Sequence, residues 1–244
     1  MELKILVGFY NAQDYITRCL QSIKSQEYTN FTCYITHDLS TDNSKAIVED
    51  FIKDDCRFLL SKDYHKKLYQ TGNFDRTIRY NNNIQDNDVL IEVDGDDYLP
   101  DTKVFSRIAK TYEDPNIWIA NGSFMYSNGA KGFSKRQEGF ECLRSSRFTA
   151  THIRTWRAFL WRGIKEEDLK TPEGEYWQWS GDLCFMYPML EMAGEEHYFY
   201  MEEINYIYNG DNPINEHKLD MFMVTSDAQS IRSKQPYKPL TRLS

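Results

Sequence analysis

The 244-residue sequence contains no apolar run of the roughly 18 residues that a membrane-spanning helix requires. Its opening residues, Met1 to Val7, pass directly into a strand pattern and lack the basic and apolar regions of a secretory signal. These two absences predict a protein without a membrane span and favour a cytoplasmic location.

The sequence also has no excess of basic residues. Its 29 lysines and arginines are outnumbered by 37 aspartates and glutamates, which gives a formal net charge of −8. Because a protein that neutralises nucleic-acid phosphates needs a basic surface, this balance argues against a nucleic-acid partner. The hydrophobic content of 41% is that of a globular protein and excludes disorder as the dominant state.

Cysteine is scarce and shows no pairing pattern. The five cysteines include no C-x-x-C sequence, and an odd number cannot all be joined within one chain. This usage suits a reducing compartment, so we expect buried free thiols rather than a disulfide framework.

Short apolar runs alternate with amphipathic stretches in the first half of the chain, which is the pattern of βαβ units. We expect strands over 4–7, 31–36, 57–60 and 89–93, and helices over 15–25, 45–53 and 71–82. The pattern predicts an α/β fold with a parallel-type sheet.

The second half is less regular. We expect strands over 117–120 and 203–208, helices over 151–160 and 182–193, a loop or hairpin excursion over 121–139, and an irregular tail from residue 225. Because the sequence shows no internal repeat and no low-complexity linker, it predicts a single domain over 1–244.

Three acidic residues, Asp94, Asp96 and Asp97, follow the strongest predicted strand. Open α/β sheets place their ligands at this carboxyl edge. Three carboxylates so close together repel one another, and a divalent cation among them offsets the repulsion. Carboxylate oxygens suit Mg²⁺ or Mn²⁺, which then bridge to a phosphate oxygen, and Gly95 lets the backbone approach closely. A solvated acidic turn is the alternative.

An acid-x-acid sequence after a strand also occurs in haloacid-dehalogenase-type phosphatases, in which the first aspartate, here Asp94, is the nucleophile. Two features argue against this reading: earlier strand–helix units precede the turn, and Asp97 stands where that family usually has Thr or Val.

Four motifs, taken in order, resemble the family 2-like glycosyltransferases of the GT-A fold. They are Val7-Gly8-Phe9-Tyr10-Asn11, Cys19-Leu20-Gln21-Ser22-Ile23 with Gln26, Asp38-Leu39-Ser40-Thr41-Asp42, and Asp94-Gly95-Asp96-Asp97. The resemblance implies a Rossmann-like three-layer sandwich around a central, mostly parallel mixed sheet. Residues 1–100 would form the nucleotide-sugar-binding half, and residues 101–244 the acceptor-binding half and the C-terminal tail.

The resemblance also implies that a UDP-hexose donor lies over the carboxyl ends of the first strands. Gly8 and Tyr10 would line the base and ribose, and Asp38 would accept a hydrogen bond from the uracil N–H. Arg76 is the candidate cation for the uracil or the diphosphate, with a helix-surface arginine as the alternative. Asp42 belongs to one of the motifs, and its alternative role is to cap the helix that follows.

In the acidic turn, the resemblance places Asp94 and Gly95 towards the ribose or sugar. Asp96 would bind Mn²⁺, or Mg²⁺, directly, and Asp97 would support or share the ion. His217 is a candidate to complete the metal shell, with a surface histidine as the alternative. The ion would neutralise the departing diphosphate.

Motifs in the second half resemble one subgroup of these transferases. They are His152-Ile153-Arg154-Thr155-Trp156 with Leu160-Trp161, Ser180-Gly181-Asp182, Met189-Leu190-Glu191-Met192-Ala193-Gly194, Tyr206-Ile207-Tyr208-Asn209 and Asn212-Pro213-Ile214-Asn215. Asp182 matches the second residue of the family's Glu-Asp pair, with Gly181 in the first position. It is the candidate general base for the acceptor hydroxyl, and a helix N-cap is its alternative. His152 and Arg154 are candidates to bind diphosphate or acceptor. Trp179 is a candidate sugar platform, with core filling as the alternative.

The sequence therefore predicts a metal-dependent, inverting glycosyltransferase that moves a hexose from a UDP-sugar to a glycan or other hydroxyl acceptor. Two alternatives stay open, a Mg²⁺-dependent phosphatase that uses Asp94, and a non-catalytic glycan-binding module with a decayed donor site. The second is consistent with Leu39 and Gly181, which depart from the family pattern.

Overall fold

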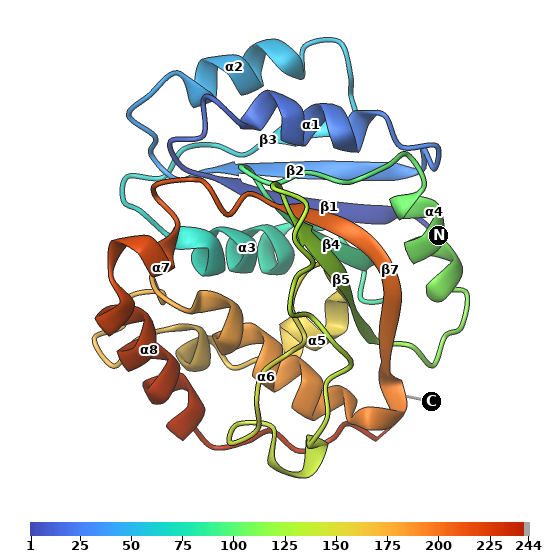
Figure 1. The fold of residues 1–244 in the computed structure, drawn as a ribbon, viewed down its shortest axis with the longest axis vertical. Helices are drawn as coiled ribbons and strands as arrows, with labels where there is room; N and C mark the ends of the chain where they lie inside the picture. Colours follow the sequence, from blue (N-terminus) through green and yellow to red (C-terminus); the bar gives the residue numbers. More distant parts are fainter. Residues whose placement is uncertain (242–244) are drawn as a thin grey trace.

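The computed structural model describes residues 1–241, apart from the side chains of residues 216 and 217. The chain is organised around a seven-stranded sheet with the order β3-β2-β1-β4-β6-β5-β7 (Figure 1). The strands are β1 (Leu3–Phe9), β2 (Phe31–His37), β3 (Phe58–Leu60), β4 (Val89–Asp94), β5 (Ile119–Tyr126), β6 (Arg154–Arg157) and β7 (Tyr198–Tyr208). Strand β6 runs antiparallel to β4 and β5, and the other neighbours are parallel. This confirms the predicted α/β fold with a mostly parallel mixed sheet.

Helices cover both faces of the sheet and give the fold three layers (Figure 1). One face packs against α1 (Ile16–Lys24), α2 (Ser44–Phe51) and α4 (Val104–Thr111), and the other against α3 (Tyr69–Tyr80), α5 (Ala158–Gly163) and α6 (Gly181–Ala193). Two further helices, α7 (Glu216–Leu219) and α8 (Met221–Ser233), follow β7. Within residues 1–241, no helix has the length and apolar character needed to cross a bilayer.

Each face of the sheet has its own buried core, because successive side chains of a strand point to opposite faces. In β1, Leu3, Ile5 and Val7 belong to the core beneath α1 and α2, whereas Leu6 belongs to the core around α3 and α6. The continuous apolar sequence of β1 thus reflects burial on both sides.

The prediction of a helix over 151–160 is wrong. The middle of this stretch forms β6, which is inserted between β4 and β5, and α5 begins only at Ala158. A short apolar stretch that includes Thr155 and Trp156 has no periodicity that separates strand from helix, so pairing with the neighbouring strands decides its state.

The loop or hairpin excursion predicted over 121–139 begins too early, because β5 continues to Tyr126. The chain then turns back so that Met125 and Lys131 form an antiparallel bridge, as in a hairpin. The polar residues of β5 are buried but hydrogen bonded; for example, Asn121 donates to Ser134 Oγ at 3.1 Å and accepts from the Tyr198 hydroxyl at 2.5 Å. Internal partners let a loop-like sequence form a buried strand.

Three helices, α4, α7 and α8, were not predicted. Residues 225–233, expected to be irregular, lie within α8, which begins at an Asp220 cap that accepts from the Met223 N–H at 3.0 Å. Residues 234–241 are irregular, as predicted. Helix α4 follows the acidic turn. The prolines of the tail, Pro236 and Pro239, lie beyond the end of α8.

All five cysteines are free thiols, as predicted. Cys19, Cys33 and Cys184 are buried, but Cys56 and Cys142 are exposed, so the expectation of burial is wrong for these two.

Two loops at the carboxyl edge of the sheet are joined by hydrogen bonds between side chains and backbone. The Asn11 N–H donates to Ser40 Oγ at 3.0 Å, and Asn11 Oδ1 accepts from the Thr41 N–H at 2.8 Å. Through these bonds the loop after β1 fixes the turn after β2.

Asp42 joins the same two loops. Its carboxylate accepts from the Gln13 N–H at 3.1 Å and from the Ser44 N–H at 3.0 Å, at the start of α2. Burial raises the pKa of Asp42, but the hydrogen bonds from Ser44 and Gln13 outweigh burial, so its pKa lies below its ordinary value. Asp42 therefore holds the loops together best as a carboxylate.

We expect Asp42→Ala to lower the free energy of unfolding by about 1–2 kcal/mol near neutral pH, because two backbone N–H groups lose their acceptor. Since the folded state lowers this pKa, the contribution is present above the unfolded pKa of about 3.9 and is lost as the pH falls through the folded value. Urea unfolding at several pH values measures the difference. Asp50→Ala is the control, because Asp50 lies on the exposed face of α2; equal destabilisation by both changes would contradict the role of Asp42.

Candidate active site

A cleft of about 1190 Å³ opens at the carboxyl ends of β1, β2 and β4, where they approach α3 and the start of α6. Most of the predicted site residues line it, although they come from both halves of the chain. These residues are Gly8, Tyr10, Asp38, Asp94, Gly95, Asp96, His152, Arg154, Trp179 and Asp182.

Two predicted residues are not among those that line the cleft. Arg76 is exposed on α3, where its guanidinium lies 4.3 Å from the ring centroid of Tyr64. Asp97 is buried, and its Oδ1 accepts from the Asn209 N–H at 2.7 Å, which ties the acidic turn to the end of β7. The His217 side chain lies outside the described residues.

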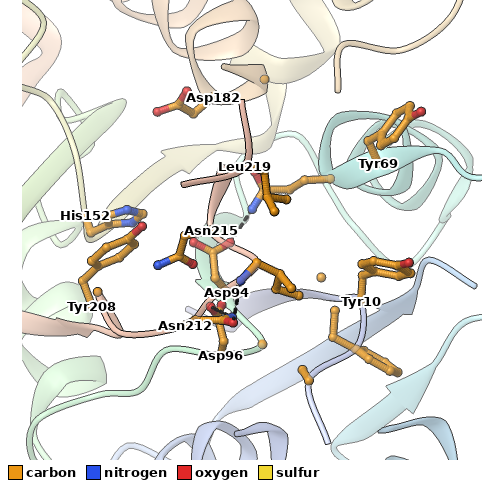
Figure 2. Close-up of a pocket in the computed structure, with 18 of the residues that line it drawn as sticks. Tyr10, Tyr69, Asp94, Asp96, His152, Asp182, Tyr208, Asn212, Asn215 and Leu219 are labelled. Carbon is orange, nitrogen blue, oxygen red and sulfur yellow. Dashed lines mark hydrogen bonds between the residues drawn. The ribbon is translucent and has the colours of Figure 1, made fainter. Parts of the chain in front are cut away.

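The two acidic residues that line the cleft are held by polar partners from distant elements. Gln70 of α3 donates to Asp94 Oδ1, and the Tyr206 hydroxyl donates to Asp94 Oδ2 at 3.3 Å. Asn212, beyond β7, donates to Asp96 Oδ2 at 2.6 Å (Figure 2). Amide and hydroxyl donors from α3, β7 and the segment after it thus surround the acidic turn.

The surroundings of the acidic turn disfavour the charged forms of its carboxyl groups. Burial raises the pKa of Asp94 well above its ordinary value, and the charges of Glu92 and Asp96 raise it further. Burial also raises the pKa of Asp96. A divalent cation would offset this repulsion.

The residues present suit a metal ion that retains part of its water shell. In the described part of the chain, no group of three or more His, Cys, Asp or Glu side chains is arranged to hold a metal. Asp94 and Asp96 both line the cleft, however, and Mg²⁺ and Mn²⁺ can bind through one or two carboxylates with water or phosphate completing the shell. The acidic pair therefore fits such an ion.

Asp182 also lines the cleft and lies above the acidic pair in the view of Figure 2. It lies in the first turn of α6, and its Oδ2 accepts from Arg154 Nη2 at 2.6 Å. The residue at the N-cap position is Ser180, so Asp182 does not hold that place. A partly exposed carboxylate in this position is available to a molecule in the cleft.

Gly181, which replaces the first acidic residue of the family's pair, is packed against α3. A Cβ atom at this position would lie 2.7 Å from Thr71 Oγ1. The close approach of α6 to α3 accounts for a residue without a side chain here.

Aromatic rings form two sides of the cleft, with Tyr10 and Tyr69 on one side and His152 and Tyr208 on the other (Figure 2). His152 stacks on the Tyr206 ring, with centroids 4.6 Å apart and an interplanar angle of 9°. Burial, together with the charge of Arg154, lowers the pKa of His152 well below its ordinary value. The imidazole is therefore neutral near pH 7.

The aromatic sequence before α6 reaches both the cleft and the core. Trp179 and Trp177 both line the cleft, and Trp177 also belongs to the buried core around α6. The sugar platform at Trp179 stays a prediction.

The sequence analysis assigned no role to Lys67, Gln70, Tyr208 and Asn212, all of which line the cleft, although Tyr208 and Asn212 belong to motifs that carry the resemblance. Lys67 and Gln70 lie at or before the start of α3, ahead of the helix start predicted at residue 71. Asn212 follows β7 much as Asp96 follows β4. The position of Asn212 just after a predicted strand was therefore a signal from which its place in the cleft could have been predicted.

The sequence pattern of the family described as "Glycosyl transferase family 2" matches residues 4–167. A teichoic acid poly(glycerol phosphate) polymerase of Staphylococcus epidermidis is 49% identical over 53 residues, 22% of this chain and 7% of that protein. Glycosyltransferase GlyA of Streptococcus pneumoniae is 30% identical over 131 residues, 54% of this chain and 18% of that protein. The chain thus spans less than a fifth of the length of these two relatives.

Solved structures share the fold. S. aureus TarS in complex with UDP-GlcNAc superposes with a TM-score of 0.70 at 17% identity, covering 95% of this chain and 64% of that one. The mannosyltransferase PcManGT from Pyrobaculum calidifontis, in complex with GDP-Man and Mn²⁺, gives a TM-score of 0.57 at 13% identity, covering 84% and 56%. The GT-A fold implied by the motifs is therefore confirmed.

Gly95 lets the acidic turn pack on β1, and we expect Gly95→Ala to destabilise the protein by about 1–3 kcal/mol through overpacking. A Cβ atom there would lie 2.6 Å from Phe9 Cβ and 3.0 Å from the Gly8 carbonyl oxygen. The matched control is Gly8→Ala, whose Cβ would meet no heavy atom closer than 3.7 Å. Thermal unfolding of both variants measures the effect, and a wild-type midpoint for Gly95→Ala would refute the packing argument.

Proposed function

Because the chain belongs to glycosyl transferase family 2, we propose that it transfers a hexose from a UDP-sugar to an acceptor hydroxyl, with a divalent metal ion and with inversion. The observation that carries the proposal is the placement of Asp182 in one cleft with Asp94 and Asp96. In this proposal residues 1–100 hold the nucleotide-sugar, and residues 101–244 supply the base and the surface for a glycan or other hydroxyl acceptor.

The structural relatives support a nucleotide-sugar donor, because TarS was solved with UDP-GlcNAc and PcManGT with GDP-Man. The motifs favour UDP, for which Gly8, Tyr10 and Asp38 would form the nucleoside site. Asp38 Oδ1 already accepts from the Leu68 N–H at 2.8 Å and from Asn73 at 3.0 Å, which fixes the carboxylate at the cleft wall.

Asp94 and Asp96 would hold the metal, Mn²⁺ or Mg²⁺, and the Mn²⁺ of PcManGT supports this assignment. A bound divalent ion supplies positive charge that stabilises the diphosphate as it leaves. Asp97 would act indirectly, since its carboxylate fixes the Asn209 N–H rather than lining the cleft.

Asp182 would take the proton of the acceptor hydroxyl. The hydroxyl oxygen forms a bond to the anomeric carbon while the bond from that carbon to the diphosphate oxygen breaks, and the electron pair leaves with UDP. One such displacement inverts the anomeric configuration. Trp179 would lie against the sugar, and the neutral His152 would bind through hydrogen bonds rather than charge.

The cation closest to the nucleotide site is Lys67 rather than Arg76. Lys67 lines the cleft, and its Nζ lies 3.3 Å from the ring centroid of Tyr10. The other basic side chain of the cleft lining, Arg154, already contacts Glu92 and Asp182. We therefore assign Lys67 to the donor diphosphate or the uracil.

Membership in family 2 disfavours a phosphatase with Asp94 as nucleophile. A decayed, non-catalytic donor site would bind no UDP in the presence of Mn²⁺, so calorimetry with UDP and Mn²⁺ separates it from an enzyme. The cytoplasmic location stays a prediction.

We expect Asp182→Asn to lower transfer by roughly 10²–10⁴-fold, because the general base is lost while the shape of the side chain is kept. The measurement is UDP released from UDP-glucose, UDP-galactose, UDP-N-acetylglucosamine and UDP-glucuronate with Mn²⁺. Water can serve as the acceptor in this assay, so the natural acceptor need not be known.

Calorimetry supplies the control for this variant. UDP with Mn²⁺ should bind wild-type protein and Asp182→Asn with similar affinity, because Asp182 belongs to α6 and not to the acidic turn. Full activity of Asp182→Asn would overturn its assignment as the base.

We expect Lys67→Met to weaken binding of UDP with Mn²⁺ about tenfold, the loss that corresponds to about 1.4 kcal/mol of charge-assisted contact. Arg76→Met is the matched control, since Arg76 is a basic residue of the same region that does not line the cleft. Calorimetric titration of both variants gives the comparison, and a larger loss for Arg76→Met would restore the original assignment.

A further inference from the structure

Strand β4 carries a buried carboxylate that the proposed reaction does not use. Glu92 is fully buried, is not among the residues that line the cleft, and precedes Asp94 by two positions, so both side chains point to the same face of the sheet. A charge buried in a central strand is costly unless it is paired. Its partner therefore indicates its role.

That partner is Arg154, which contacts two carboxylates at once. Its Nη1 donates to Glu92 Oε1 at 2.9 Å and its Nη2 donates to Asp182 Oδ2 at 2.6 Å. The Arg154 side chain is only 5% exposed, and its Nε has no hydrogen-bond partner among the described residues. One guanidinium thus links the buried Glu92 with the cleft-facing Asp182.

The sheet fixes the Glu92 end of this link. Ile91 of β4 pairs with Thr155 of β6 in the antiparallel ladder, and Glu92 and Arg154 are the next residues along the two strands. Cross-strand neighbours have closely spaced Cβ atoms, so their contact is set by the backbone. Asp182, in contrast, belongs to α6, and its side chain is 28% exposed.

Because the Arg154 guanidinium contacts two carboxylates, Glu92 also affects how Asp182 is held. An arginine with a single carboxylate partner favours a two-point contact, in which both carboxylate oxygens face the guanidinium. Because Glu92 occupies Nη1, Asp182 is held through Oδ2 by Nη2. Its Oδ1 is then left for the cleft.

We propose that Glu92 is a positioning residue that acts through Arg154 to keep Asp182 aimed into the cleft. The kinetic consequence rests on the proposed function, in which Asp182 is the base. The geometric consequence does not, because it concerns only the three side chains.

The test uses Glu92→Gln, which keeps the shape of the side chain and removes its charge. We expect its crystal structure to show the Asp182 carboxylate turned towards Arg154, with both oxygens in contact. If Asp182 is the base, kcat should fall roughly 100-fold, the cost of a displacement of about 1 Å, while KM for the UDP-sugar changes less than about twofold. A purely structural role would not produce this split between kcat and KM.

Glu191→Gln is the matched control. Glu191 also pairs with a buried arginine, accepting from Arg144 Nε at 2.6 Å and Nη2 at 2.8 Å, but neither residue lines the cleft. We expect Glu191→Gln to lower the unfolding temperature and to leave both kcat and the position of Asp182 unchanged.

Arg154→Lys is a second route to the same structural result, because one ammonium group cannot contact both carboxylates with the fork geometry of arginine. We expect it to release Asp182 from its wild-type position while Glu92 is intact. If only one of the two variants folds, the position of Asp182 in its crystal structure still tests whether Arg154 links Glu92 to Asp182.

The outcomes separate the two hypotheses. An unmoved Asp182 in the crystal structures of Glu92→Gln and Arg154→Lys overturns the positioning role, whatever the protein catalyses. A displaced Asp182 with unchanged kcat supports the positioning role and overturns Asp182 as the base.

Discussion

The crowding of carboxylates at the end of β4 is the constraint on which the rest of the cleft depends. Glu92, Asp94, Asp96 and Asp97 are acidic residues within six positions of one buried strand and its turn. Buried carboxylates need hydrogen-bond donors or cations, since water cannot solvate them. Besides Gln70 of α3, the donors come from the second half of the chain, through Arg154 of β6, Tyr206 of β7, and Asn209 and Asn212 beyond it. Satisfying these carboxylates therefore also brings the second half of the chain over the first.

The first half of the fold could be predicted because its signals are local. Strands β1, β2 and β4 are apolar runs bounded by polar turns, and side chains at their carboxyl ends must meet at one edge of a parallel sheet. The placement of Asp38, Asp94 and Asp96 in the cleft follows from that rule. Strand β6 could not be predicted, because its state depends on two partner strands that lie far away in the sequence.

The predicted roles of individual side chains failed for a different reason, because a motif does not say which way each side chain points. Arg76 lies on the predicted helix, but the pattern does not say that this position faces solvent beside Tyr64, whereas Lys67 faces the cleft. Asp97 belongs to the same acidic motif as Asp96, yet its carboxylate is used by Asn209. Motif order locates a backbone segment, and the contacts of each side chain then decide which residues reach a ligand.

The two departures from the family pattern lie in distinct local settings. At Gly181, a Cβ atom would lie 2.7 Å from Thr71 Oγ1, so a larger residue would force one of the two to shift. Leu39 adopts a φ of 59°, a left-handed conformation that favours glycine over residues with a side chain. The neighbouring hydrogen bonds among Asn11, Ser40 and Thr41 hold the turn in that conformation.

The charges of the cleft explain how an acidic protein could bind a diphosphate. Among the described residues, Lys67 and Arg154 are the lysine and arginine that line the cleft. Arg154 is shared between Glu92 and Asp182, and Lys67 lies over the Tyr10 ring. One lysine cannot offset both the acidic pair and a diphosphate. Under the proposed function, a divalent ion must therefore contribute to donor affinity, and because linkage is reciprocal, the donor must equally strengthen the binding of the ion. The acidic turn would then act as a site for the metal–nucleotide pair, with little affinity for either member alone.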